Sequence, residues 1–427
     1  MLSAGIAQTL LLAIVAISIL LMLVRPRDIP EVYWVGGGAV LLLLLGLIPP
    51  NAALRAVGKG SDVYFFLTGM MLLSELAREF GVFDWLASLA VRSARGSRAR
   101  LFFLVYAVGT AVTVFMSNDA TAVVLTPAIL VAVRKIRVSP LPYLFACAFV
   151  ANAASFVLPI SNPANLVVFD SHLPSLGQWL IRFLLPSVLS IVATLLILQW
   201  VFRVELQGTI EHSPEASPLT RHGRMVVVGL ALTVVGLLVA SAFDRDLGLP
   251  TCVIAVIVAA IVCSLARNNP LPLLREISWS TLALVAGLFV LVEAVVGIGG
   301  LRYTQAWLEK AQGLAVAAGT FVTGLVVGIA NNIVNNLPLG LIAGSTLRAT
   351  HATRLISSAV LIGVDVGPNL AITGSLATIL WLIALRRERL DVSFWRFFKV
   401  GVIAMPVALF SSLAGALAME WLLRKFL

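Results

Sequence analysis

Long apolar stretches recur from one end of the chain to the other. Many reach the roughly 17–25 residues that a helix needs to cross the hydrocarbon core of a bilayer. The pattern predicts ten membrane-spanning helices, near residues 5–24, 32–49, 62–78, 141–170, 180–202, 225–242, 249–266, 279–298, 355–385 and 400–423. We therefore expect an all-α polytopic membrane protein.

Four apolar stretches are interrupted by polar residues at their centres. Those at 141–170 and 355–385 are too long for one plain crossing and contain Pro, Gly and Asn in the middle. We interpret them as broken helices, and the stretches at about 101–134 and 314–347 as re-entrant hairpins. Non-helical backbone at membrane depth is tolerated only where protein or a water-filled cavity covers it. The four interruptions should therefore lie inside the molecule.

The two halves of the chain resemble each other. The segment "LVYAVGTAVTVFMSND" (104–119) is similar to "LAVAAGTFVTGLVVGIANN" (314–332). Because each half has five crossings, the second must be inverted relative to the first. We predict two inverted repeats, 1–202 and 225–427, joined by a polar cytoplasmic linker at 203–224. Inverted repeats with interrupted helices are typical of secondary transporters.

Composition and charge agree with this interpretation. The chain is 60% hydrophobic and 12% charged, which leaves no room for a sizeable soluble domain. Its net charge of +10 does not indicate nucleic-acid binding, because 20 of the 30 Lys and Arg residues fall in loops that the topology places in the cytoplasm. Both termini are then outside, the first hairpin enters from the cytoplasm and the second from outside. The three cysteines have neither zinc-site nor disulfide-framework spacing.

The interruptions are candidates for a substrate site. Each places Asn beside Ser, Thr, Asp or Pro, as in "VFMSNDATAVVLTP" (114–127). Helix breaks expose backbone donors and acceptors, and Asn supplies one of each. The alternative is that these side chains only satisfy backbone groups freed by the breaks. The candidate substrate-binding residues are Ser117, Asn118, Thr121, Ser161, Asn162, Asn165, Asn335, Asn336, Asn369, Thr373 and Ser375.

The composition of these segments limits the charge that the ligand can have. They contain no Lys or Arg, so a di- or tricarboxylate lacks an obvious counter-ion, although a helix N-terminus can hold an anion without one. The polar set suits a small neutral ligand with hydroxyl groups. Asp119 and Asp365 are the acidic residues placed most deeply, and a carboxyl group in a medium of low dielectric constant can carry a proton. We expect them to couple transport to protons; cation binding and helix capping are the alternatives.

At these residues the chain resembles the bacterial arsenite efflux permeases, the ArsB family. The similarity runs from about residue 15 to 423 and is carried by "FMSNDATAVVLTPAIL", "FVANAASFVLPISNPANLVVF", "NNLPLG" and "VDVGPNLAITGSLATILWL". The resemblance implies an inner-membrane exporter of arsenite and antimonite as neutral trihydroxides, and an elevator movement of the hairpin-bearing parts. It also implies proton antiport, or docking of a soluble arsenite-stimulated ATPase. No cofactor, metal or enzymatic activity is implied, and the oligomeric state stays open.

Three departures from the family pattern and several alternatives remain. Asn152 stands where the family has Asp, Asn369 follows Pro368 where the family has Lys, and Asn331-Asn332 adds a second Asn pair upstream of the usual one. A proton carried by that Asp in relatives would here fall to Asp365 or Asp119. Silicic acid export, or sodium- or proton-coupled anion transport, would use the same scaffold. A channel is disfavoured because the broken-helix repeats fit alternating access better. An intramembrane aspartyl protease is disfavoured because the chain lacks the GxGD and PAL motifs.

Overall fold

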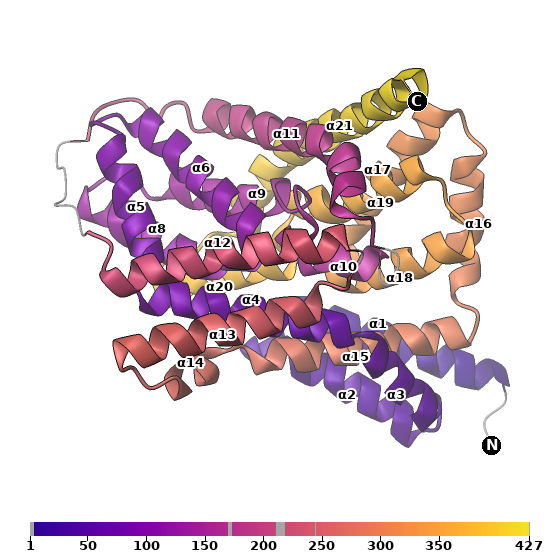
Figure 1. Ribbon diagram of the computed structural model, residues 1–427. Coiled ribbons are helices and arrows are strands. Elements are labelled where there is room, and N and C mark those ends of the chain that lie inside the picture. The colour runs from indigo at the N-terminus through magenta and orange to yellow at the C-terminus, as the bar shows by residue number, and fades with distance from the viewer. Residues whose placement is uncertain (1–3, 170–172, 211–217, 244, 427) are drawn as a thin grey trace.

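The computed structural model describes residues 4–169, 173–210, 218–243 and 245–426, and in this part of the chain the regular elements are helices (Figure 1). The first half contains α1 (Ala4–Val24), α2 (Glu31–Leu44), α3 (Pro50–Lys59), α4 (Ser61–Glu79), α5 (Val82–Ser93), α6 (Arg98–Phe115), α7 (Asn118–Ala120), α8 (Thr126–Lys135), α9 (Leu141–Ala153), α10 (Pro163–Phe169) and α11 (Leu176–Val201). The second contains α12 (Arg221–Ala242), α13 (Gly248–Ala266), α14 (Leu271–Glu276), α15 (Trp279–Gly297), α16 (Leu301–Gln312), α17 (Val316–Val334), α18 (Asn336–Ala349), α19 (Arg354–Val366), α20 (Leu376–Arg387) and α21 (Phe394–Phe426).

Every predicted span coincides with a helix or with a pair of helices. Among the described residues, eight stretches are long and apolar enough to cross a membrane, and α2 and α9 are shorter apolar helices. The second predicted span ends early, at Leu44, because Gly46 adopts a positive φ of 65° and Pro49 and Pro50 follow. The protein is a multi-pass, all-helical membrane protein; its crossing number and repeats stay predictions.

Two long helices are broken where the sequence predicts it. The stretch 141–170 forms α9 and α10 with an interruption between Ala153 and Pro163, and its last residue, 170, lies outside the described residues. The stretch 355–385 forms α19 and α20, separated by two short 3₁₀ turns between Gly367 and Gly374. These interruptions place helix ends inside the protein.

The first predicted hairpin reverses direction at Met116 and Ser117, where α6 ends and α7 begins. The Thr121 hydroxyl lies 2.8 Å from that of Thr113 and donates to the carbonyl of Gly109, so the returning leg packs against α6. Between α7 and α8 the helix widens into one π turn, Thr121–Leu125, just before Pro127, which has no N–H to donate. The second hairpin reverses at Asn335, whose φ is +80°. The depth of both hairpins in a membrane stays a prediction.

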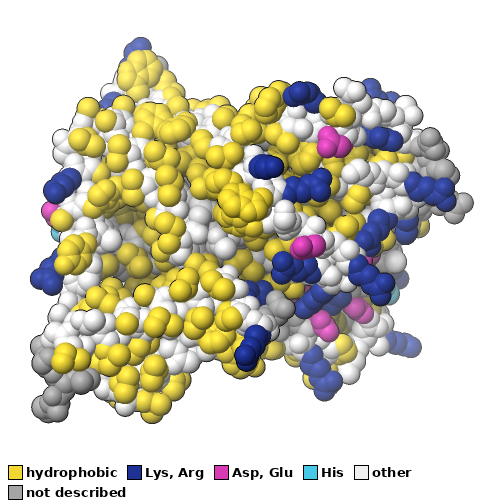
Figure 2. Space-filling view, turned by 180° about the vertical axis from the view of Figure 1, so that it is seen from behind, with side chains coloured by type: hydrophobic (Ala, Val, Ile, Leu, Met, Phe, Trp, Pro, Cys, Tyr) yellow, Lys and Arg dark blue, Asp and Glu magenta, His cyan; other side chains and the backbone are white. Residues whose placement is uncertain are grey.

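The two ends of the molecule differ in charge. Both ends of the described chain lie at one end of the structure, while the α5–α6 and α8–α9 connections lie at the other (Figure 1). Figure 2 shows most of the Lys and Arg side chains of one face gathered toward one end, with apolar side chains over the rest. This separation is the one that the predicted topology requires, with the connections at the basic end in the cytoplasm.

Helices of the first half of the chain pack against helices of the second half. Helix α2 packs against α15, and α13 packs against α4. Helices α11 and α21 pack along each other, and each is the last long helix of its half. Such reciprocal packing is what two repeats related by a pseudo-twofold axis would produce.

The contact between α4 and α13 provides a test of the packing. A Cβ atom on Gly69 would lie 2.8 Å from the backbone of Thr251 and Cys252, so the two helices approach closely only because this side chain is absent. Overpacking typically costs about 1–3 kcal/mol. We expect Gly69→Ala to lower the melting temperature of the purified protein by several degrees in a fluorescence scan.

The control is Gly58→Ala on α3, where an added Cβ meets nothing within 4 Å. This substitution should leave the melting temperature unchanged or raise it slightly, because alanine restricts the unfolded chain more than glycine does. Equal melting temperatures for the two variants would contradict the close approach of α4 and α13.

Candidate functional site

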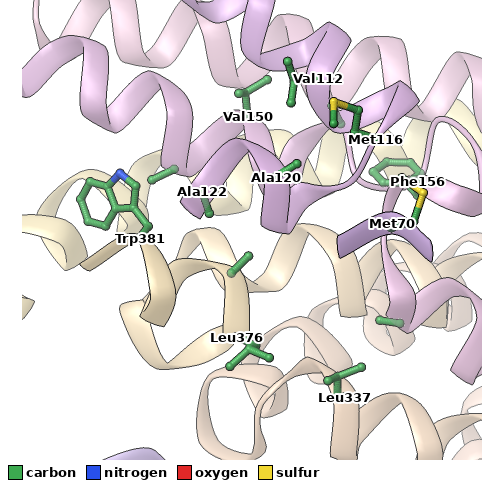
Figure 3. Close-up of a cluster of buried hydrophobic side chains, with 14 of the residues drawn as sticks. Met70, Val112, Met116, Ala120, Ala122, Val150, Phe156, Leu337, Leu376 and Trp381 are labelled. Carbon is green, nitrogen blue, oxygen red and sulfur yellow. The ribbon is translucent and has the colours of Figure 1, made fainter. Parts of the chain in front are cut away.

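The four interruptions meet around a small chamber of about 10 Å³, which is roughly the space that one water molecule needs. Each contributes two consecutive residues to its wall, and α4 and α15 supply the remaining side. Figure 3 labels Ala120, Leu337 and Leu376, which lie on three of these segments. The chamber is lined by Leu67, Asn118, Asp119, Asn162, Pro163, Thr281, Asn336, Leu337, Leu376 and Ala377.

Four helical segments begin at this chamber, and a side chain caps each of them. Backbone N–H groups of a first helical turn have no intrahelical partner, and Ser and Asn are favoured caps because their oxygens accept from them. The side-chain oxygens of four residues accept from backbone N–H groups of the helix that follows. The N···O pairs are Ala120 with Ser117 (3.1 Å), Ala164 with Asn162 (3.0 Å), Leu337 with Asn335 (3.5 Å) and Thr378 with Ser375 (3.1 Å). Four of the predicted substrate-binding residues are thus N-caps.

The helix starts set the electrostatics of the chamber. A helix N-terminus is equivalent to about half a positive elementary charge, so the three longer segments, beginning at Asn118, Asn336 and Leu376, supply about +1.5. Among its described lining residues there is no Lys or Arg. The carboxyl groups of Asp119, in the wall, and Asp365, behind Asn162, oppose the helix ends. The positive helix ends and the two carboxylates are therefore close to balance.

A hydrogen bond between the two broken helices holds Asp365. The Asn162 amide donates to Asp365 Oδ1 with its Nδ2 while its Oδ1 caps α10. Asp365 is buried, with only 1% of its surface exposed. Asn162 therefore fixes the position of this carboxyl group relative to the first break.

A second contact between the broken helices is the counterpart of the first. The Ser375 hydroxyl donates to Asn152 Oδ1 at 3.2 Å, and the Asn152 amide donates to Asn369 Oδ1 at 3.0 Å and Thr378 Oγ1 at 3.2 Å. Asn152 precedes Asn162 by ten residues, just as Asp365 precedes Ser375. In each break, the earlier of these two residues is thus hydrogen-bonded to the later residue of the other break. Two halves related by a repeat would produce this pattern.

Three buried oxygen atoms near the chamber have no hydrogen-bond partner within the described part of the chain. They are Oδ1 of Asn118, Oδ1 of Asn336 and Oδ2 of Asp365. Asn118 and Asn336 line the chamber, and Asp365 reaches its wall through Asn162. An unpartnered buried acceptor costs about 1–3 kcal/mol unless a donor is supplied, so these atoms are suited to a ligand with several hydroxyl donors.

The side chains of other predicted site residues form hydrogen bonds with backbone groups of their own half. The Asn165 amide donates to the carbonyls of Ser155, Leu158 and Pro159, and the Ser161 hydroxyl donates to Val114. These bonds close the first break and join it to the first hairpin. Thr121 likewise holds the hairpin together through its bonds to the first leg. For these residues the structure favours the alternative that they satisfy freed backbone groups.

The second half contains equivalent supporting bonds. Asn335 donates to the carbonyl of Thr373 at 3.1 Å, and the Thr373 hydroxyl donates to the carbonyl of Asn332 at 2.9 Å. The Asn369 amide crosses to the carbonyl of Phe149 on α9. Asn332, which the sequence interpretation did not select, also donates to Gly367. The contacts of Asn332, Asn335 and Thr373 join the second hairpin to the second break, and that of Asn369 joins the two breaks.

A wider cavity of about 460 Å³ leads from the surface to Ser117, Asp119 and Pro163. Thr281 lines both this cavity and the chamber. It was missed because a Thr near the start of an apolar helix has no distinguishing signal in the sequence. Besides Asp119, the charged residues of the cavity wall are Glu75, Arg78, Glu276, Arg387 and Glu388.

Most of these charged groups are paired. Arg78 lies 2.6 Å from Glu75 and 3.8 Å from Glu276, and Arg134 lies 3.0 Å from Glu388. These charged residues lie where the cavity opens at the basic end of the molecule. The cavity therefore offers small solutes a route from that end to Asp119.

Asn165 and Asn336 allow the supporting and chamber-facing roles to be separated. Asn165→Ala should lower the melting temperature clearly, because three buried carbonyls lose their donor at about 1–3 kcal/mol for each unsatisfied group. Asn336→Ala should change it little, because its side-chain oxygen has no partner to lose. Thermal unfolding of both variants in the same detergent is the measurement, and the reverse order would contradict the assignment.

Comparisons with known proteins place the chain among membrane transporters. It is 28% identical over 423 residues to the arsenical pump membrane protein of Escherichia coli K12, covering 96% of this chain and 98% of the relative. The corresponding protein of Yersinia enterocolitica is 29% identical over 370 residues, 82% of this chain and 84% of that one.

Two solved structures share the fold at 14% sequence identity. The YdaH transporter of Alcanivorax borkumensis has a TM-score of 0.57 and covers 88% of each chain. MtrF of Neisseria gonorrhoeae has a TM-score of 0.55 and covers 89% of this chain and 84% of its own. A family model described as citrate transporter matches residues 6–385. With this match over most of its length, the chain belongs to the citrate transporter family, CitMHS.

Proposed function

We propose that this protein exports arsenite and antimonite from the cytoplasm as neutral trihydroxides, in exchange for protons. The observation that carries the proposal is the chamber, whose described wall has unpartnered acceptor oxygens on Asn118 and Asn336 and no Lys or Arg. At about 10 Å³ the chamber is closed around this site, and it must widen to admit the solute. A trihydroxide offers three O–H donors and no charge. The similarity to arsenical pump membrane proteins supports the same substrate.

The description of the family raises the alternative of a citrate-like anion. A tricarboxylate carries up to three negative charges and would need cationic partners in a medium of low dielectric constant. The chamber offers the N-terminal ends of helices, and two carboxyl groups oppose them. This balance disfavours a multiply charged anion more than a neutral solute. Silicic acid would suit the chamber equally, and the relatives favour arsenite over it.

Two carboxyl groups are proposed to carry the coupled proton. Asp119 lines both the wide cavity and the chamber, so a proton that it releases can leave through this cavity at the basic end. Asp365 is more deeply buried and is held by Asn162. If one carboxyl group binds the proton and the substrate alternately, the two cannot be bound at the same time. This mutual exclusion is what antiport requires. On this proposal a docked ATPase is not needed for the exchange.

The contacts between the broken helices support a movement of both as one body. Asn162 with Asp365, and Asn152 with Ser375, join elements more than 200 residues apart in the chain. The hairpins are fastened to the same breaks through Ser161 and Thr373. We propose that hairpins and broken helices carry the chamber together, elevator-like, past the remaining helices. In this proposal the basic end faces the cytoplasm of a bacterial cell and both termini lie in the periplasm.

Inside-out membrane vesicles provide the direct test. Arsenite uptake should require a pH gradient that is acid inside, should disappear when the gradient is collapsed, and should not change when sodium is replaced by potassium. No arsenite uptake under any gradient would overturn the substrate assignment. Dependence on sodium would overturn the proton coupling.

The chamber amides give a sharper test in the same vesicles. Asn118→Ala and Asn336→Ala should each reduce arsenite uptake at least about tenfold, because each removes an acceptor for a buried hydroxyl. Asn268→Ala, at an exposed position after α13, is the matched control and should transport normally. Normal uptake by both chamber variants at equal expression would show that the substrate binds elsewhere.

Coupling can be separated from binding with Asp365→Asn. The new amide keeps an oxygen that can accept from Asn162, so the fold should persist, but it cannot carry a proton. Uptake driven by the pH gradient should be lost, while exchange of labelled for unlabelled arsenite without a gradient should remain. Unchanged gradient-driven uptake would exclude Asp365 as the proton carrier and leave Asp119.

A further inference from the structure

Five exposed arginines without an acidic partner among the described residues lie at the end of α5, the start of α6 and the start of α12. They are Arg92, Arg95, Arg100, Arg221 and Arg224. Some other exposed arginines are paired, such as Arg134 with Glu388, and some are not, such as Arg275 and Arg396. What distinguishes the five is that they border hollows of the outer surface.

These arginines border a continuous series of hollows on the outer surface. Arg92 is shared by a hollow beside α6 and another beside α5, and Arg224 is shared by the latter and a groove between α12 and α13. Trp85 and Phe103 lie in the same series. Aromatic side chains beside basic ones are typical of the membrane–water interface.

The groove between α12 and α13 changes character along its length. It begins with Arg221 and Arg224 and continues with apolar side chains only, Met225, Val228 and Leu232 on α12 and Val258, Ile261 and Val262 on α13, with Gly229 between them. From Arg221 to Leu232 the helix rises about 16 Å. This length and polarity match a phosphate group followed by an acyl chain.

We propose that this groove binds an anionic glycerophospholipid of the cytoplasmic leaflet. The phosphate lies against Arg221 and Arg224, near the N-terminus of α12, and one acyl chain fills the groove between α12 and α13. Both helices are long and apolar enough to span a membrane, and Val228 and Leu232 are exposed, so lipid chains reach the groove directly. The site is separate from the chamber and does not depend on the transported substrate.

The charge pattern favours a lipid over a second copy of this chain as the occupant. A copy would have to bring acidic side chains to Arg221 and Arg224, but the chain has 20 acidic against 30 basic residues. Several of its acidic side chains, such as Glu75, Glu388 and Asp391, are already paired with arginines. An anionic headgroup supplies the missing charge without any such partner.

Native mass spectrometry of the intact protein, released from detergent containing phosphatidylglycerol, tests the proposal. The wild-type protein should retain phosphatidylglycerol in preference to phosphatidylcholine. Arg221→Gln combined with Arg224→Gln should weaken retention about tenfold or more, since each basic residue near an anionic surface contributes about a factor of five. Arg396→Gln combined with Arg275→Gln is the control, because it removes the same charge outside the groove.

A second variant tests the acyl-chain part. Val228→Trp fills the groove and keeps both arginines, so it should also reduce phosphatidylglycerol retention, whereas glycerol 1-phosphate should not displace the lipid. Equal retention by the groove and control variants would overturn the proposal. Displacement by glycerol 1-phosphate would show a phosphate site without an acyl chain, and a lipid-free dimer disrupted by Val228→Trp would show a second copy as the occupant; either result also overturns it.

Discussion

The need to satisfy backbone N–H groups where helices begin inside the protein governs the rest of this structure. Four helical segments start around one chamber, and water cannot reach most of their first turns. Ser117, Asn162, Asn335 and Ser375 cap them, which is why Ser and Asn recur at the interruptions. The residue after a cap, Asn118 or Asn336, then faces the chamber. Neighbouring residues of the same motif thus cap the helices and line the chamber.

The same arrangement sets the kind of solute that the chamber tolerates. Helix starts contribute positive potential from several directions, and the carboxyl groups of Asp119 and Asp365 oppose it. No Lys or Arg among the described lining residues adds further positive charge. A charged ligand would disturb this balance, whereas a neutral ligand with hydroxyl donors would complete the hydrogen bonding of oxygens that are otherwise unpartnered. Protonation of one carboxyl group changes the balance by one unit, which gives a physical basis for linking a proton to a neutral substrate.

Reciprocal contacts between the two halves give the chamber its rigidity. Asn152 bonds to Ser375 and Asp365 to Asn162, so neither broken helix is complete without the other. The hairpin tips are attached to the breaks by further bonds to backbone carbonyls. Meanwhile the outer helices, such as α12 and α13, present apolar side chains to the membrane and arginines to its surface. The chamber and the membrane-facing surface are thereby built from different helices.

The sequence by itself determined the helical spans, the two breaks and the identity of the four polar segments. These follow from hydrophobic length and from Pro, Gly and Asn within it, which act locally. It could not separate Asn165, whose amide donates to three carbonyls of its own break, from Asn336, which lines the chamber, because each is an Asn beside Leu in an interruption. It also gave no signal for Thr281. Only the tertiary structure decided these roles, because a side chain's hydrogen-bond partners come from segments distant in the chain.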